Sequence, residues 1–122
     1  MRIAIIGSRQ GFDSETVNNK LYELFKEISP TWWSDIKLLS GGAKGIDNYA
    51  AIFAKQNDMD IEIIRPINPN NKIDYLFRNI EIITKAYKII AFWDGKSRGT
   101  KFVIDYAKAR NKEILILNKG DE

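Results

Sequence analysis

The chain has 122 residues, 44% of them hydrophobic and 29% charged, a balance typical of one folded domain rather than of a disordered segment. It contains no cysteine and no histidine, which excludes disulfides, cysteine or histidine nucleophiles, and the usual ligand sets of zinc, iron–sulfur clusters and haem. The 19 basic and 16 acidic residues are scattered along the chain, so the net charge of +3 indicates only a mild attraction to anions.

Five short β-branched runs alternate with stretches of helical periodicity, a pattern typical of a parallel sheet with helices on both faces. Strands are expected at Arg2–Ile6, Ile36–Ser40, Ile61–Arg65, Tyr87–Trp93 and Glu113–Leu117. The first and fourth runs are apolar at nearly every position, as strands buried on both sides are. We therefore predict an α/β fold over residues 1–122, a single domain with a five-stranded parallel sheet in three layers.

Apolar side chains at helical spacing predict four helices between these strands. The four apolar stripes are Val17, Leu21, Leu24, Phe25 and Ile28; Ile46, Ala50, Phe53 and Ala54; Ile73, Phe77, Ile80 and Ile83; and Val103, Tyr106 and Ala107. Ser14 is the expected N-cap of the first helix. We interpret Trp32 and Trp33, which precede the second strand, as packing or subunit-contact residues.

The hydropathy of the chain indicates where the protein is located. No apolar stretch approaches the ~20 residues of a membrane span, and the N-terminal apolar run is too short for a signal peptide, so a cytoplasmic protein without a membrane partner is expected.

Open parallel sheets bind ligands outside the carboxyl ends of their strands. The loops that follow the strands are therefore where chemistry is expected.

The first and second of these loops have features of anion sites. Gly7-Ser8-Arg9 combines a glycine with an arginine that can bind phosphate or carboxylate, although an ordinary turn with a solvated arginine fits equally well. The stretch from Ser40 to Asp47 reads SGGAKGID and leads into a helix, where backbone N–H groups favour a phosphate. It is neither a dinucleotide fingerprint nor a Walker loop. On physics alone, Asp47 is better explained as a helix cap than as a ligand to a sugar hydroxyl.

The loop after the fourth strand, Trp93-Asp94-Gly95-Lys96-Ser97-Arg98-Gly99-Thr100, is again polar and leads into a helix. Asp94 can bind a ribose hydroxyl or a metal, but a turn aspartate fits at least as well. Trp93 can stack on a base, although packing at the strand end is the better-supported alternative. Arg78, in the third helix, is interpreted from its spacing alone as part of a surface salt bridge.

Together these stretches resemble the successive motifs of the SLOG superfamily, in its small stand-alone branch. The resemblance rests on Gly7-Ser8-Arg9, on Ser40 to Asp47, on Arg78-Asn79 and on Ala91 to Thr100, and it covers most of the chain. The superfamily includes the Lonely Guy phosphoribohydrolases, the DNA-processing protein of natural transformation and sensors of nucleotide signals in antiviral defence. The resemblance implies a Rossmann-like fold, a nucleotide pocket at the carboxyl edge of the sheet and a homodimer or larger homo-oligomer.

The candidate ligand-binding residues are Gly7, Ser8, Arg9, Ser40, Gly41, Gly42, Lys44, Gly45, Asp47, Arg78, Asn79, Trp93, Asp94, Gly95, Ser97, Arg98, Gly99 and Thr100. In the phosphoribohydrolases the last loop reads Pro-Gly-Gly-x-Gly-Thr-x-x-Glu, but here Val103 stands at the glutamate's position, so the catalytic carboxylate is missing. Asp47 and Asp94 are the candidates for a substitute acid or base. No metal site is expected, and magnesium is compatible with the residues but not implied.

The sequence leads to one main hypothesis and two alternatives. The main hypothesis is capture, without turnover, of a nucleotide or nucleotide-derived signal, with phosphates on the Gly42-Lys44-Gly45 and Arg98-Gly99-Thr100 loops and the ribose near Asp47 or Asp94. The first alternative is an N-glycosidase that acts on a nucleotide. The second is a single-stranded DNA module like the DNA-processing protein, which the absence of a concentrated basic groove with interleaved aromatic residues disfavours.

Overall fold

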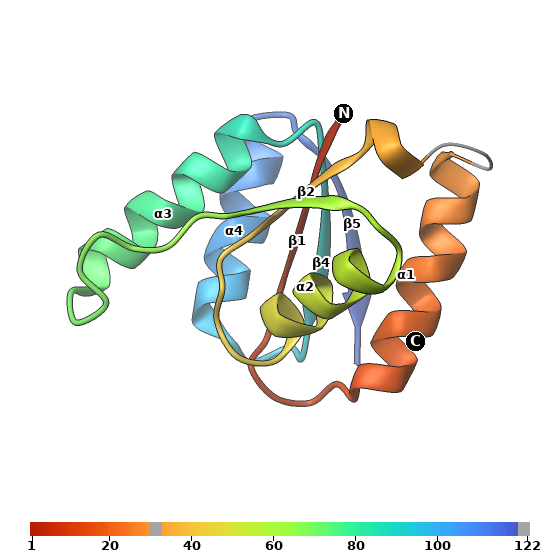
Figure 1. The fold of residues 1–122 in the computed structure, drawn as a ribbon. Coiled ribbons are helices and arrows are strands. Elements are labelled where there is room, and N and C mark those ends of the chain that lie inside the picture. Colours follow the sequence, from red (N-terminus) through yellow and green to blue (C-terminus); the bar gives the residue numbers. More distant parts are fainter. Residues whose placement is uncertain (30–32, 120–122) are drawn as a thin grey trace.

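Five parallel strands form one sheet in the computed structural model, which describes residues 1–29 and 33–119. The strands are β1 (Arg2–Gly7), β2 (Lys37–Ser40), β3 (Asp60–Ile63), β4 (Lys88–Trp93) and β5 (Glu113–Asn118). The helices are α1 (Ser14–Ile28), α2 (Ile46–Gln56), α3 (Lys72–Lys85) and α4 (Arg98–Ala109), and a short 3-10 helix, η1, spans Trp33–Asp35. The strand order is β3-β2-β1-β4-β5, so β1 lies at the centre (Figure 1).

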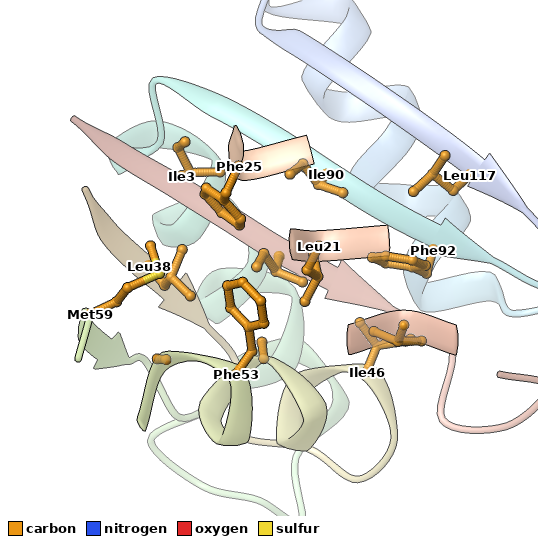
Figure 2. Close-up of a cluster of buried hydrophobic side chains, with 14 of the residues drawn as sticks. Ile3, Leu21, Phe25, Leu38, Ile46, Phe53, Met59, Ile90, Phe92 and Leu117 are labelled. Carbon is orange, nitrogen blue, oxygen red and sulfur yellow. The ribbon is translucent and has the colours of Figure 1, made fainter. Parts of the chain in front are cut away.

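The sheet separates two hydrophobic clusters because successive side chains of a strand point to opposite faces. Ile3 and Ile5 of β1 face α1 and α2, where Phe25 and Phe53 stack with their ring centroids 5.6 Å apart (Figure 2). Ala4, on the other face of the same strand, packs in the cluster formed with α3 and α4. This is the three-layer α/β fold that the alternating pattern predicts, and the fold class is confirmed.

The expected strands agree with the observed ones to within one or two residues. The largest difference is at β3, which ends at Ile63 and not at Arg65. β3 is an edge strand that pairs with β2 alone among the described residues, and β2 ends at Ser40, which is in register with Ile63. One further backbone hydrogen bond, from Ile64 N to Ser40 O at 2.8 Å, follows before the chain leaves the sheet. The strand therefore stops where its partner stops.

Of two expectations about the helices, one is wrong and the other is correct only in part. Asp13, not Ser14, caps α1, and its Oδ1 accepts a hydrogen bond from Thr16 N at 2.9 Å. In α3 only the C-terminal part of the expected apolar stripe is buried: Ile83 is 1% exposed, whereas Ile73 and Phe77 are 57% and 63% exposed. The N-terminal end of α3 projects away from the body of the molecule, so only the C-terminal half packs on the sheet (Figure 1).

Trp33 has the packing role that was one of its two interpretations. Its ring contacts Phe25 and Phe53 with centroid distances of 6.1 and 5.9 Å, and its Nε1 donates to Phe25 O and Ser29 O. Trp32 lies outside the described residues, and the subunit contact stays a prediction. None of the described helices is long and apolar enough to cross a membrane.

Candidate functional site

A crevice is expected beside β1, because the chain reverses its direction across the sheet there. β2 and β3 lie on one side of β1, whereas β4 and β5 lie on the other. The loops after β1 and β4 therefore lead to helices on opposite faces, and such divergence opens a ligand-binding crevice at the carboxyl edge.

A cleft of about 440 Å³ lies at this position. It receives residues from the loops after β1, β2 and β4 and from the projecting half of α3. Of the candidate residues, those that line it are Gly7, Arg9, Gly41, Asp47, Arg78, Asn79, Asp94, Ser97, Gly99 and Thr100. The loops before α2 and α4, which the sequence presents as two separate stretches, thus share one cleft.

The remaining candidates do not line the cleft; they are Ser8, Ser40, Gly42, Lys44, Gly45, Trp93, Gly95 and Arg98. Several of them hold the loops in place. Ser8 is buried, and its Oγ accepts from Asp94 N at 3.1 Å, which ties the first loop to the fourth. Trp93 donates from Nε1 to Ser97 O at 3.1 Å, so it braces the loop before α4 and does not face the cleft.

The loop before α2 is shaped by close packing against its neighbours. Gly45 has a φ of +77°, and a Cβ atom there would lie 2.6 Å from the carbonyl oxygen of Arg9. Only glycine fits such a position without strain. Ser40 is fully buried, and its Oγ donates to Asp47 O at 3.2 Å and accepts from Gly42 N at 3.4 Å. Gly45 and Ser40 therefore set the loop geometry that presents Gly41 and Ala43 to the cleft.

Asp47 is the buried acid of the cleft, with 7% of its surface exposed. Its Oδ2 accepts from Ala43 N at 3.1 Å, so it closes the loop rather than capping the helix as expected. Burial raises the pKa of this carboxyl, and the Ala43 N–H and the charges of Arg78 and Arg9 only partly oppose that effect. No Lys or Arg nitrogen within the described residues forms an ion pair with it.

Arg78 links α3 to the loop before α2. It is only 8% exposed, so the surface salt bridge expected from its helical spacing is wrong. Its Nη1 donates to Gly41 O at 2.6 Å and its Nε to Asn79 Oδ1 at 2.8 Å, while the guanidinium lies 5.2 Å from the centroid of the Tyr75 ring. A Cβ atom on Gly41 would lie 2.5 Å from Nη1, so this close approach requires glycine.

In the loop before α4, backbone N–H groups hold the acidic side chain, Asp94. Asp94 Oδ1 accepts from Ser97 N and Lys96 N, both at 2.8 Å, and these bonds lower the pKa of Asp94. Ser97 is the N-cap of α4, and its Oγ accepts from Thr100 N at 3.4 Å. Asp94 therefore behaves as the turn aspartate that the sequence allowed, although it also borders the cleft.

The two helix starts are chemically unequal. The first turn of α4 contains no acidic residue, and among the described residues the backbone N–H groups of Arg98 and Gly99 have no protein acceptor. The first turn of α2 contains Asp47, whose carboxylate repels an anion. The cleft therefore favours a phosphate at α4 more than at α2, where a phosphate would meet the carboxylate of Asp47 beside the charges of Arg78 and Arg9.

Sequence reasoning missed several residues of the cleft wall: Gln10, Ala43, Tyr75 and Leu76. Tyr75 lies three residues before Arg78, so helical spacing would have placed it beside the arginine once Arg78 was assigned to the site. Gln10 and Ala43 carry no such signal. Among the described residues, no group of three acidic side chains is arranged to hold a metal ion.

Replacing Asp47 by asparagine is expected to raise the free energy of unfolding at neutral pH, on the order of 1 kcal/mol, because an unpaired buried charge is removed. The pKa of Asp47 is raised above 3.8 in the folded protein, so the wild type loses stability as the pH rises through that raised pKa. The advantage of Asp47→Asn should therefore vanish below about pH 4, where the wild-type carboxyl is protonated in both states.

Urea unfolding at several pH values measures this difference. Asp94→Asn is the matched control with the opposite sign, because the pKa of Asp94 is lowered and its contribution to stability is present above 3.8 and lost at lower pH. If Asp47→Asn is less stable than the wild type at neutral pH, the carboxylate is not the destabilising buried charge described above.

Comparison with known proteins finds solved structures that share the fold of this chain, but it finds no closer relationship. No family model and no curated protein matches the sequence. DNA processing protein A from Streptococcus pneumoniae superposes with a TM-score of 0.77 and 18% identity, over 94% of this chain and 49% of that one. The chain shares the fold of DNA processing protein A. The Rossmann-like fold that the resemblance to the SLOG superfamily implies is confirmed.

Two further structures share the fold. DNA processing protein A from Helicobacter pylori, whose single-stranded DNA binding mode has been described, matches with a TM-score of 0.73 and 21% identity over 95% of this chain and 64% of its own. TM1055, a structural genomics target, matches with a TM-score of 0.69 and 15% identity over 93% and 71% of the two chains. This chain thus spans about half of the pneumococcal DNA processing protein A and under two thirds of the Helicobacter one.

Proposed function

We propose that the chain captures a nucleotide or a nucleotide-derived signalling molecule in the cleft beside β1, with the phosphate at the start of α4. The observation that carries this proposal is the convergence of the loops before α2 and α4 and of two arginines, Arg9 and Arg78, on one cleft. Its volume of about 440 Å³ lies within the range of small-molecule sites. The free N–H groups of the first turn of α4 supply the phosphate contacts.

Capture is favoured over turnover by the residue that lines the cleft one turn into α4. The phosphoribohydrolases that the sequence resembles carry a glutamate at this position, whereas this chain has Val103, which lines the cleft and cannot transfer a proton. The rival activity is an N-glycosidase, and the observation in its favour is the raised pKa of Asp47. Release of free base from a nucleotide, lost in Asp47→Asn, would establish the enzyme.

Single-stranded DNA is the second candidate ligand, favoured by the shared fold with the Helicobacter protein. The affinity for a DNA strand falls steeply with salt, because each phosphate contact releases counterions. A single nucleotide enclosed in the cleft should respond only weakly to salt.

Thermal shift measurements with adenosine monophosphate, guanosine monophosphate, inorganic phosphate and oligothymidylate test these alternatives. A mononucleotide at a hundredfold excess over its dissociation constant should stabilise the fold by about 2.7 kcal/mol. The proposal fails if no mononucleotide stabilises the protein, and DNA replaces it if only oligothymidylate does so with a steep salt dependence.

A further inference from the structure

The carboxylate of Asp47 is almost fully buried and accepts few hydrogen bonds. A carboxylate offers about four acceptor positions, and within the described residues this one receives a single hydrogen bond, from Ala43 N at 3.1 Å. It is 7% exposed and forms no ion pair in the described part of the chain. Burying a charge with so little compensation is costly. Because Asp47 lines the cleft, a ligand there can donate the missing hydrogen bonds.

The surroundings of Asp47 limit the kind of donor that fits. A phosphate at this end would meet a carboxylate, which repels it. A cation would meet Arg78 and Arg9, whose charges already act on Asp47. Arg78 is itself occupied, since Nη1 donates to Gly41 O and Nε to Asn79 Oδ1. Uncharged O–H or N–H donors are the groups that remain.

The other acid of the cleft does not fit this role as well. Asp94 Oδ1 already accepts from the backbone N–H groups of Ser97 and Lys96 at 2.8 Å each. These bonds satisfy the charge locally and hold the carboxylate in its turn. Of the two aspartates considered for a sugar, the structure therefore favours Asp47.

We propose that Asp47 is a specificity-determining residue, which accepts hydrogen bonds from the vicinal hydroxyl groups of a ribose and rejects a phosphate at the same end of the cleft. This inference rests on the proposed function, which places a phosphate at the start of α4. In a ribonucleotide only one sugar ring separates the phosphate from the two ribose hydroxyls, and a cleft of about 440 Å³ accommodates that short span. The selected ligand is a ribonucleotide with an unmodified hydroxyl edge.

The test compares ligand pairs on the wild type and on Asp47→Asn by calorimetric titration. Wild-type protein should bind adenosine monophosphate roughly 10- to 100-fold more tightly than deoxyadenosine monophosphate, the loss expected for one hydrogen bond to a charged acceptor. In Asp47→Asn that ratio should fall to within about threefold, because the neutral amide is a weaker acceptor. Adenosine bisphosphate, with its second phosphate on the ribose, should bind the variant better than it binds the wild type.

Asp60→Asn is the control, because Asp60 is exposed at the start of β3 and does not line the cleft, and it should keep the wild-type preference for the ribose. The inference is overturned if the wild type binds the ribo and deoxy forms equally, or if Asp47→Asn keeps the wild-type ratio. Inosine monophosphate tests a donor on the base: a large loss relative to adenosine monophosphate, with no effect of the sugar, would assign Asp47 to the base amine and overturn the ribose assignment. Equal binding of both sugars leaves the proposed function intact, whereas no binding of any nucleotide removes both.

Discussion

Replacing Arg78 by methionine is expected to lower the free energy of unfolding by about 2–3 kcal/mol. Methionine fills much of the same space, but it leaves Gly41 O and Asn79 Oδ1 without the donors that now lie 2.6 and 2.8 Å away. It also removes a positive charge that acts on the buried carboxylate of Asp47. A buried acceptor that loses its donor bears the full cost of its own desolvation.

The same substitution should weaken nucleotide binding at least tenfold, because Gly41 and Asp47 line the cleft and both lose their neighbour. Urea unfolding and calorimetric titration measure the two effects. Arg78→Lys should recover part of the stability, since lysine keeps the positive charge but not the planar guanidinium group that donates to both acceptors. Arg110→Met is the matched control: Arg110 is the exposed C-cap residue after α4 and does not line the cleft, it lies over the Tyr106 ring, and its loss should cost less than about 1 kcal/mol. An Arg78 variant as stable as this control would contradict the buried role.

Gly99→Val is expected to weaken nucleotide binding by roughly 10- to 100-fold while leaving the fold intact. Gly99 lines the cleft in the first turn of α4, and nothing lies within 4 Å of a Cβ atom built there. The protein therefore accommodates a Cβ atom at this position, and a larger side chain occupies the space from which a phosphate would reach the backbone N–H groups. Glycine is also a poor helix residue, so its replacement should not lower stability.

Gly99→Ala is the graded control and should lie between the wild type and Gly99→Val in affinity. Its free energy of unfolding should equal or exceed that of the wild type, by up to about 1 kcal/mol. Titration with adenosine monophosphate and urea unfolding of the same preparations give both quantities. If Gly99→Val binds as the wild type does, the phosphate is not at the start of α4 and the proposed orientation of the ligand is wrong.

These results would separate two kinds of glycine that look alike in the sequence. Gly45 is held by a positive φ and by the carbonyl oxygen of Arg9, so its substitution damages the loop itself. Gly99 has open space in front of it, so its substitution affects only what enters that space. Both follow a strand and precede or begin a helix, and the spacing of the glycines does not distinguish them.

The sequence predicted the fold well because a parallel sheet buried on both faces requires continuous apolar runs. β1 and β4 show such runs, and their observed bounds differ from the expected ones by a single residue. α3 is a helix, as predicted, but only the C-terminal part of its apolar stripe is buried. Its apolar residues Ile73 and Phe77 are exposed because that half of the helix extends past the sheet, and no local pattern encodes where a sheet ends.

By itself, the sequence determined that glycine-rich loops follow β1, β2 and β4, since glycine and polar residues interrupt the apolar runs at those points. The tertiary structure alone decided which of their groups meet. Arg78 bonds to Gly41, 37 residues away in the chain, and this contact exists only because the fold brings α3 next to the loop after β2. Asp47 has an elevated pKa because that packing buries it. Burial and long-range contact are properties of the assembled layers, so the polarity of the cleft could not be predicted from the order of the residues.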